Sequence, residues 1–142
     1  RQMCIRDRDI PFEEKDEIQG SADAHNVHNI SLVTPASENR IQMIASEATG
    51  FLYCVSSNGV TGVRSEFRTN FAPFFEKIHK YAKVPCAVGF GISGPEAARE
   101  MSRYCDGVIV GSAVVRLVEQ YGKEAPEKIG AFVKSLRDAL DA

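Results

Sequence analysis

The chain has 142 residues, 44% of them hydrophobic and 25% charged, with a formal net charge of −2. That length suits one compact domain with a single core. No cluster of lysine and arginine forms a basic stripe, which argues against a nucleic-acid partner. No apolar run reaches the ~20 residues of a membrane-spanning helix, and no secretory hydrophobic segment follows the first residue. We therefore expect a cytoplasmic protein that contacts neither membrane nor nucleic acid.

The first eight residues differ in character from the rest. The segment RQMCIRDR is rich in arginine, shows no hydrophobic periodicity and does not begin with methionine. We interpret residues 1–8 as a non-native leader and expect the domain over residues 9–142. On this interpretation no strand precedes Asp9.

From residue 9 onward, short apolar runs alternate with segments of helical spacing. The charged segment FEEKDE is typical of the first turn of a helix, which places Glu13 and Glu14 on a solvated face. Strands are predicted at 29–33 and 51–57, where β-branched and aromatic residues gather. The helix between them is predicted from Ile41 to Ala48, with Ser37 as its N-cap.

The second half of the sequence continues this alternation. Strands are predicted at 84–90 and 107–110, and helices at 71–78, 94–104 and 113–121. A longer final helix follows, and the residues predicted on its inner face are Ile129, Phe132, Val133, Leu136 and Leu140. The three later cysteines lie in or beside apolar runs and are interpreted as reduced core residues: Cys54, Cys86 and Cys105.

The strands are almost continuously apolar, as burial on both faces requires. Strands separated by helices imply a parallel α/β sheet with right-handed crossovers. Two architectures fit this pattern, an open doubly wound sheet and part of a closed (β/α)8 TIM barrel. A complete barrel needs ~250 residues, so the chain would supply about half of one.

Neither cysteine nor histidine spacing indicates a metal site. The four cysteines stand far apart, without the paired spacing of metal ligands. No histidine has a cysteine, serine or second carboxylate at a spacing that suggests a metal site or a catalytic triad: His25, His28 and His79. We expect no metal in this chain.

Glycine and serine follow the predicted strands at their carboxyl ends. Glycine there lets the backbone approach a ligand closely, and a helix that starts there adds N–H donors and the positive end of its dipole. In β/α barrels the last two strands and a short extra helix commonly bind a phosphate. The segment GVIVGSAVV fits this arrangement, and Ser112 would offer both a hydroxyl and an amide. The alternative is that Ser112 is only an N-cap and the glycines only make tight turns.

The segment NGVTGVRSEFR has the composition of a loop over the strand ends. Its glycines, small residues and charges favour a mobile active-site lid, in which Thr61 and Gly62 would be hinge or contact residues. The alternative is a long surface loop without a role in binding.

Five segments together resemble the tryptophan synthase alpha subunit family: DIPFEEKDE, ISLVTPASENRIQMIA, FLYCVSSNGVTGVRS, VGFGIS and GVIVGSAVV. Their order and spacing cover residues 9 to about 140. The resemblance implies the C-terminal half of the family's TIM barrel, about its last four to five β/α units. It also implies a lyase that cleaves indole-3-glycerol phosphate to indole and glyceraldehyde 3-phosphate by a retro-aldol reaction in tryptophan biosynthesis.

The resemblance also implies partners and site residues. Indole would pass to a beta subunit in an alpha2-beta2 assembly, and pyridoxal phosphate would belong to that subunit, leaving no cofactor in this one. Tyr53 matches a tyrosine on the pocket floor, although a core aromatic is the alternative. The positions that match the phosphate site and its lining are Gly62, Phe90, Gly91, Gly111 and Ser112.

Two further matches concern loops. Thr61 matches a lid threonine that helps to order the catalytic carboxylate, and Asp9 matches an aspartate of the loop that communicates with the beta subunit. A solvated residue before Ile10-Pro11 is the alternative for Asp9.

The family's catalytic glutamate and aspartate have no match in this sequence, since both lie upstream of residue 9 in the family. Glu13 and Glu14 do not replace them, because they belong to the charged turn. We expect the chain alone to lack a closed barrel and catalysis. Its exposed edges predict aggregation or dimerisation.

Two other functions remain open on the residues alone. Another phosphate-binding barrel, acting on phosphoribosyl compounds, would share the anion site, although the lid segment SSNGVTGVRS favours the alpha subunit. A non-catalytic module that binds a phosphate ligand or a beta-type partner would fold on its own and bind without turnover.

Overall fold

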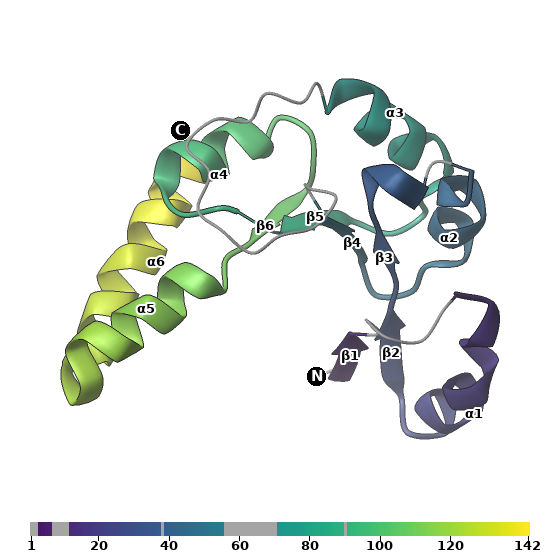
Figure 1. The fold of residues 1–142 in the computed structure, drawn as a ribbon, viewed down its shortest axis with the longest axis horizontal. Coiled ribbons are helices and arrows are strands. Elements are labelled where there is room, and N and C mark those ends of the chain that lie inside the picture. Colours follow the sequence, from purple (N-terminus) through teal and green to yellow (C-terminus); the bar gives the residue numbers. More distant parts are fainter. Residues whose placement is uncertain (1–2, 7–11, 38, 56–70, 90) are drawn as a thin grey trace.

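A computed structural model describes residues 3–6, 12–37, 39–55, 71–89 and 91–142. Strand β1 (Met3–Arg6) pairs with β2 (Val27–Ile30), and a second sheet has the order β3 (Leu32–Val33), β4 (Leu52–Val55), β5 (Cys86–Gly89), β6 (Gly107–Ile109). All these pairs are parallel. A single residue, Ser31, separates β2 from β3, so the first sheet leads directly into the second (Figure 1).

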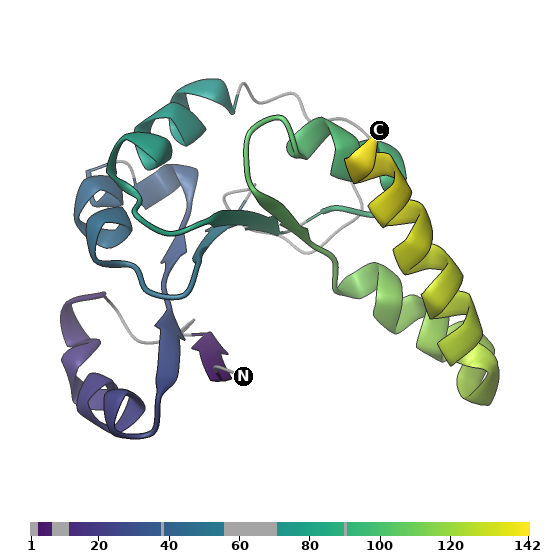
Figure 2. The ribbon, with the colours of Figure 1, turned by 180° about the vertical axis from the view of Figure 1, so that it is seen from behind.

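Helices connect the strands. They are α1 (Asp16–Ala24), α2 (Ile41–Glu47), α3 (Ala72–Tyr81), α4 (Pro95–Met101), α5 (Ser112–Tyr121) and α6 (Ala125–Asp141), with 3-10 turns η1 (Phe12–Glu14), η2 (Pro35–Ser37) and η3 (Gly122–Glu124). Figures 1 and 2 show the strands and helices as an arc, with α1 at one end and the α5–α6 pair at the other. Within the described ranges, no helix is long and apolar enough to cross a membrane.

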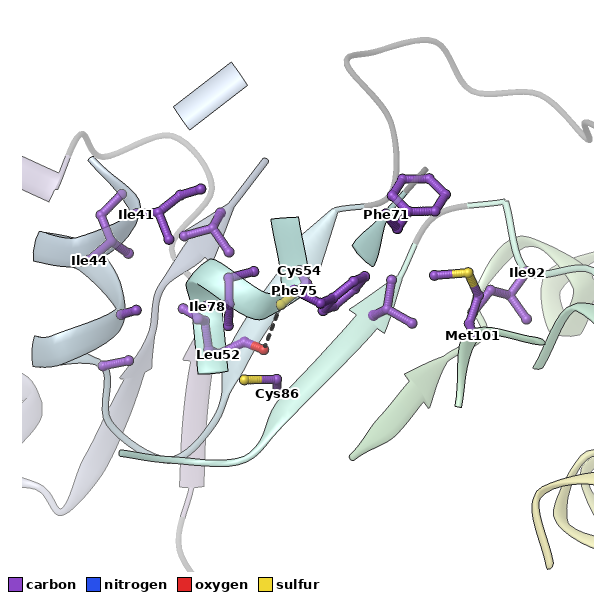
Figure 3. Close-up of a cluster of buried hydrophobic side chains, with 14 of the residues drawn as sticks. Ile41, Ile44, Leu52, Cys54, Phe71, Phe75, Ile78, Cys86, Ile92 and Met101 are labelled. Atoms are coloured by element: carbon purple, nitrogen blue, oxygen red, sulfur yellow. Dashed lines mark hydrogen bonds between the residues drawn. The ribbon is translucent and has the colours of Figure 1, made fainter. Parts of the chain in front are cut away.

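The core lies between the strands and the helices that cover one face of them (Figure 3). Alternate strand residues point to this covered face: Val33, Leu52, Cys54, Cys86 and Val88, each at most 1% exposed. Phe75 of α3 lies at the centre, with ring centroids 5.2 Å from Phe74 and 5.8 Å from Tyr104. Such a cluster carries most of the hydrophobic stabilisation of a small domain.

The intervening strand residues point to the opposite face, because side chains alternate along a strand. Leu32, Ala87 and Ile109 on this open face are only half-buried. Tyr53, with 9% of its surface exposed, and Gly89 are buried exceptions on this face. The sheet therefore has one face that is fully covered over β3 to β5 and one partly open face.

The parallel α/β prediction is confirmed, and so are most predicted helices. In α4, within the predicted helix 94–104, Ala98 and Met101 are fully buried. The expectation that no strand precedes Asp9 is wrong, because Met3–Arg6 forms β1 and pairs with β2. The hydrophobic pattern gave no signal for β1, because strand pairing is made by backbone N–H and C=O groups, which do not depend on the side chain.

Two details of the predicted helices are also wrong. Arg40, not Ser37, directly precedes α2, since Ser37 ends η2 and its hydroxyl accepts a hydrogen bond from the Thr34 N–H at 3.3 Å. A local turn of this kind competes with helix capping for the same side chain. Val133 of α6 is 49% exposed, whereas Leu136 is buried as predicted.

Candidate functional site

Two of the predicted glycines follow neighbouring strands at the carboxyl edge of the sheet. The last register pair between β5 and β6 is Gly89 with Ile109. In the sequence, Gly91 and Gly111 each come two residues after a member of that pair, beyond the ends of β5 and β6. Gly91 has φ of +81°, a backbone conformation that favours glycine. A Cβ added at either position would meet no atom within 4 Å among the described residues, so the space beside both is open.

Helix α5 begins at this edge. Gly111 is its N-cap residue and provides no side-chain cap, and Ser112 is its first residue. The N–H groups of a helix's first turn have no acceptor within the helix, and they carry the positive end of its dipole. Gly111 and Ser112 are both exposed. The start of α5 therefore presents backbone donors and a hydroxyl to solvent, an arrangement that favours an anion.

Tyr53 reaches across the open face toward this edge. Its register partner on β5 is Ala87, but its hydroxyl lies over Gly89, where an added Cβ would be 2.1 Å from the oxygen. Gly89 is therefore required by the tyrosine ring rather than by a turn. Tyr53 is a buried aromatic on a buried strand, as the alternative prediction held, although it lies outside the cluster on the covered face.

The remaining predicted site residues lie outside the described part of the chain. These are Asp9, Thr61, Gly62 and Phe90. Within the described residues, Gly91, Gly111 and Ser112 follow the carboxyl ends of β5 and β6, and the Tyr53 hydroxyl lies over Gly89 of β5.

The two glutamates of the FEEKDE segment lie as predicted. Glu13 and Glu14 are exposed in η1. Glu13 makes an ion pair with Arg40 at 3.4 Å, a surface contact of little energetic weight.

The three later cysteines are free thiols, as predicted. The hydrogen bond between Cys54 and Cys86, together with burial, raises the pKa of Cys54. The same bond, with the nearby His79, lowers the pKa of Cys86. Burial raises the pKa of Cys105, which packs at the margin of the core. All three belong to the covered side of the sheet.

Sequence analysis did not predict one group of three residues with metal-ligating atoms. His79, Cys86 and Asp106 each have a ligating atom within 4.8 Å of the others. They come from α3, from the first residue of β5 and from the residue before β6. Linear spacing carries no signal for this set, because the fold brings three separate elements together.

The parallel strands and their outer helices define an α/β fold of the β/α-barrel class. Known proteins specify the family. A family model of the tryptophan synthase alpha chain matches residues 5–141. The tryptophan synthase alpha chain of Lacticaseibacillus casei is 46% identical over 134 residues, 94% of this chain and 50% of the relative. That of Clostridium kluyveri is 42% identical over 135 residues, 94% of this chain and 51% of the relative.

Solved structures agree. Tryptophan synthase subunit alpha from Legionella pneumophila superposes with a TM-score of 0.74 at 27% identity, over 98% of this chain and 52% of that one. Mycobacterium tuberculosis tryptophan synthase gives a TM-score of 0.80 at 27% identity, over 97% of this chain and 51% of that one. The chain belongs to the tryptophan synthase alpha chain family and spans about half the length of the curated relatives it matches.

Proposed function

We propose that this chain supplies the phosphate-binding half of a lyase that cleaves indole-3-glycerol phosphate to indole and glyceraldehyde 3-phosphate. Family membership supports the reaction. The observation that carries the proposal is that Gly91 follows β5 and Gly111 and Ser112 follow β6 at the same edge of the sheet, while the Tyr53 hydroxyl lies over Gly89 of β5. On this proposal the protein acts in tryptophan biosynthesis in the cytoplasm.

The phosphate would bind at the start of α5. The N–H groups of the first turn and the Ser112 hydroxyl would donate to phosphate oxygens, and the helix dipole would favour the negative charge. The open space at Gly91 and Gly111 lets the ligand approach the backbone, whereas a side chain there would occupy that space. This edge thus fixes one end of the substrate.

Tyr53 would contact the middle of the substrate. Its hydroxyl lies over Gly89, close to the last register pair of β5 and β6, so it faces the open side below the phosphate position. From there it can hydrogen-bond the glycerol portion. We propose Tyr53 as a binding residue, with Phe90, Thr61 and Gly62 completing the pocket and lid as the family resemblance implies.

The bond cleavage itself needs two proton transfers. One group removes a proton from a glycerol hydroxyl and another delivers a proton to the indole carbon as the carbon–carbon bond breaks, so the proton count is conserved. No residue of this sequence matches the family's acid–base pair. We therefore propose that the 142-residue chain by itself binds substrate weakly and does not turn it over.

The partner is also a proposal. One structural relative is the tryptophan synthase a2b2 complex of the hyperthermophile Pyrococcus furiosus, which matches at 25% identity with a TM-score of 0.76. By analogy a beta subunit would accept the indole and hold pyridoxal phosphate, while this chain would need no cofactor for the cleavage. Asp9 would lie in the communicating loop.

A chimera tests the function. The first half of the Lacticaseibacillus casei relative, joined to residues 3–142 in place of its own second half, restores an acid–base pair to this chain. Indole release from indole-3-glycerol phosphate is measured for the chimera, its Ser112→Asp variant and a Ser21→Asp control on exposed α1. We expect activity in the chimera and the control, and a KM at least about tenfold higher in Ser112→Asp, because two like charges repel at the anion site.

Two results would contradict the proposal. A folded chimera without indole release would argue against the lyase, and glycerol phosphate binding without turnover would then favour the non-catalytic module. Equal KM values for the two serine variants would place the phosphate elsewhere.

A further inference from the structure

We propose that His79, Cys86 and Asp106 form a binding site for a zinc-type divalent metal ion, at the opposite edge of the sheet from the phosphate-binding edge. The inference is independent of the proposed function. It departs from the expectation that the chain holds no metal.

The three residues meet because a crossover helix runs back along the sheet. Cys86 opens β5 and Asp106 directly precedes β6, so both lie at the amino ends of their strands. His79 lies in the last turn of α3, the helix that leads into β5. Their ligating atoms, a ring nitrogen, a sulfur and a carboxylate oxygen, all lie within 4.8 Å of one another. Ligands of a tetrahedral zinc ion are about 3.5 Å apart, so the exposed His79 and Asp106 side chains would have to move by about 1 Å to complete the geometry.

Cys86 and Asp106 are held in place by reciprocal hydrogen bonds. The Cys86 N–H donates to Asp106 Oδ2 at 2.8 Å, and the Asp106 N–H donates to the Cys86 carbonyl at 2.9 Å. A carboxylate oxygen has more than one lone pair, so Asp106 keeps acceptor capacity for a metal. The contact already orients the carboxylate, as the hydrogen bonds around metal-ligating groups usually do.

His79 has the hydrogen bond that metal-binding histidines typically make. Its Nε2 lies 2.7 Å from the Tyr104 carbonyl oxygen. Because a carbonyl only accepts, Nε2 carries the proton and Nδ1 keeps its lone pair. A ligating histidine almost always donates its other N–H to a carbonyl or carboxylate in this way. The Tyr104 ring stacks on Phe75 with centroids 5.8 Å apart, which anchors this acceptor in the core.

The donor set and its burial favour zinc. Nitrogen, sulfur and oxygen donors together suit Zn²⁺ better than Mg²⁺ or Ca²⁺, which prefer oxygen alone. Cys86 is 1% exposed and forms the floor, where Figure 3 shows its side chain in the buried cluster, while His79 and Asp106 are exposed at the rim. A thiolate and a carboxylate balance the two positive charges, and water can fill the fourth position. Binding would release the thiol proton to solvent.

The test measures metal binding by the 142-residue chain and four variants. His79→Gln and Asp106→Asn each remove a ligand but retain a partner for Tyr104 or for the Cys86 N–H, which keeps the structural hydrogen bonds. His25→Gln, in the exposed cap of α1, and Cys105→Ser are the matched controls. Equilibrium dialysis with ZnCl2 gives the stoichiometry and affinity, Co²⁺ substitution gives the absorption spectrum, and circular dichroism without metal checks that each variant is folded.

We expect one Zn²⁺ per chain, a tetrahedral cobalt spectrum with a thiolate charge-transfer band, and a zinc-dependent rise in melting temperature. His79→Gln and Asp106→Asn should each weaken zinc binding at least about tenfold, while the two controls bind as the unaltered chain does. The proposal is overturned if the unaltered chain shows no stoichiometric zinc or no thiolate band. It is equally overturned if both ligand variants keep full affinity, or if Cys105→Ser abolishes binding.

Discussion

The two faces of the sheet differ in how completely they are covered. On the covered face, Val33, Cys54 and Val88 have no exposed surface, because α2, α3 and α4 pack against them. On the open face, Leu32, Ala87 and Ile109 are only half-buried. In the sequence, the strand residues that face either side of the sheet are almost all apolar, so the sequence does not distinguish the two faces. The comparison shows that one face is fully packed over β3 to β5, and that the opposite, more open face carries the candidate site.

The largest effect on stability is expected when a buried aromatic side chain is removed from the covered face. Phe75→Ala should lower the free energy of unfolding by about 3–5 kcal/mol, because a fully buried aromatic leaves a cavity. Ile109→Ala on the open face should cost less than about 2 kcal/mol, since its side chain is already partly hydrated. Urea unfolding followed by circular dichroism measures both. Equal losses would mean that the two faces are equally important to stability.

The next test concerns the contact between Tyr53 and Gly89. Gly89→Ala should destabilise the chain by about 1–3 kcal/mol, because its Cβ would overlap the tyrosine ring. Gly107→Ala is a matched control, since its Cβ would lie at an ordinary 3.8 Å from that of Ala87 and should change stability by less than about 0.5 kcal/mol. Urea unfolding of both variants measures the difference.

A double-mutant cycle sharpens this result. In a Tyr53→Ala background the cost of Gly89→Ala should largely disappear, because the ring that it meets is gone. An undiminished cost would place the strain in the β5 backbone instead.

A smaller effect should appear at alkaline pH. Burial keeps the pKa of Cys105 above its ordinary value of 9.0, so the folded chain holds this thiol protonated where the unfolded chain ionises. The free energy of unfolding should therefore be unaffected below pH 9.0 and fall as pH rises through the raised pKa. Unfolding curves across this range, compared with Cys105→Ala, measure the contribution. A fall that is identical in both chains would assign it to other groups.

The smallest effect on stability is expected at α5. Val115 and Val118 are 54% and 48% exposed, and no residue of this helix is buried. Replacing both with lysine should change stability by less than about 0.5 kcal/mol. It should also reduce self-association of the chain, because an exposed apolar patch favours contact between molecules. Light scattering measures the association, and a monodisperse unaltered chain would contradict the expectation.

Local pattern was sufficient to predict the strands and helices that pack on the covered face. Leu52 and Cys54 lie in an apolar run, and Ile41, Ile44 and Ala45 recur at helical spacing, so burial leaves a direct trace in composition. Strand β1 leaves none, since its pairing with β2 depends on backbone groups.

The candidate site was predicted only in part. Glycine and serine after a strand indicate an anion site, which pointed to Gly111 and Ser112. The position of the Tyr53 hydroxyl over Gly89 depends on the register between two strands, and the approach of His79 to Asp106 depends on where a crossover helix ends. Such relations are set by tertiary packing and are not visible in spacing along one chain.

The short run from β2 to β3 also bears on how the sheet would close. Val27–Ile30 pairs with β1 on one side, whereas Leu32–Val33 pairs with β4 on the other, and the carbonyl of Ser31 accepts the Tyr53 N–H at 3.0 Å. The continuous segment of β2, Ser31 and β3 thus pairs with β1 and with β4 at different positions along its length. This stagger is the shear that makes strands tilt around a cylinder instead of standing upright. A stagger of the kind that a tilted barrel strand requires is therefore present within this chain.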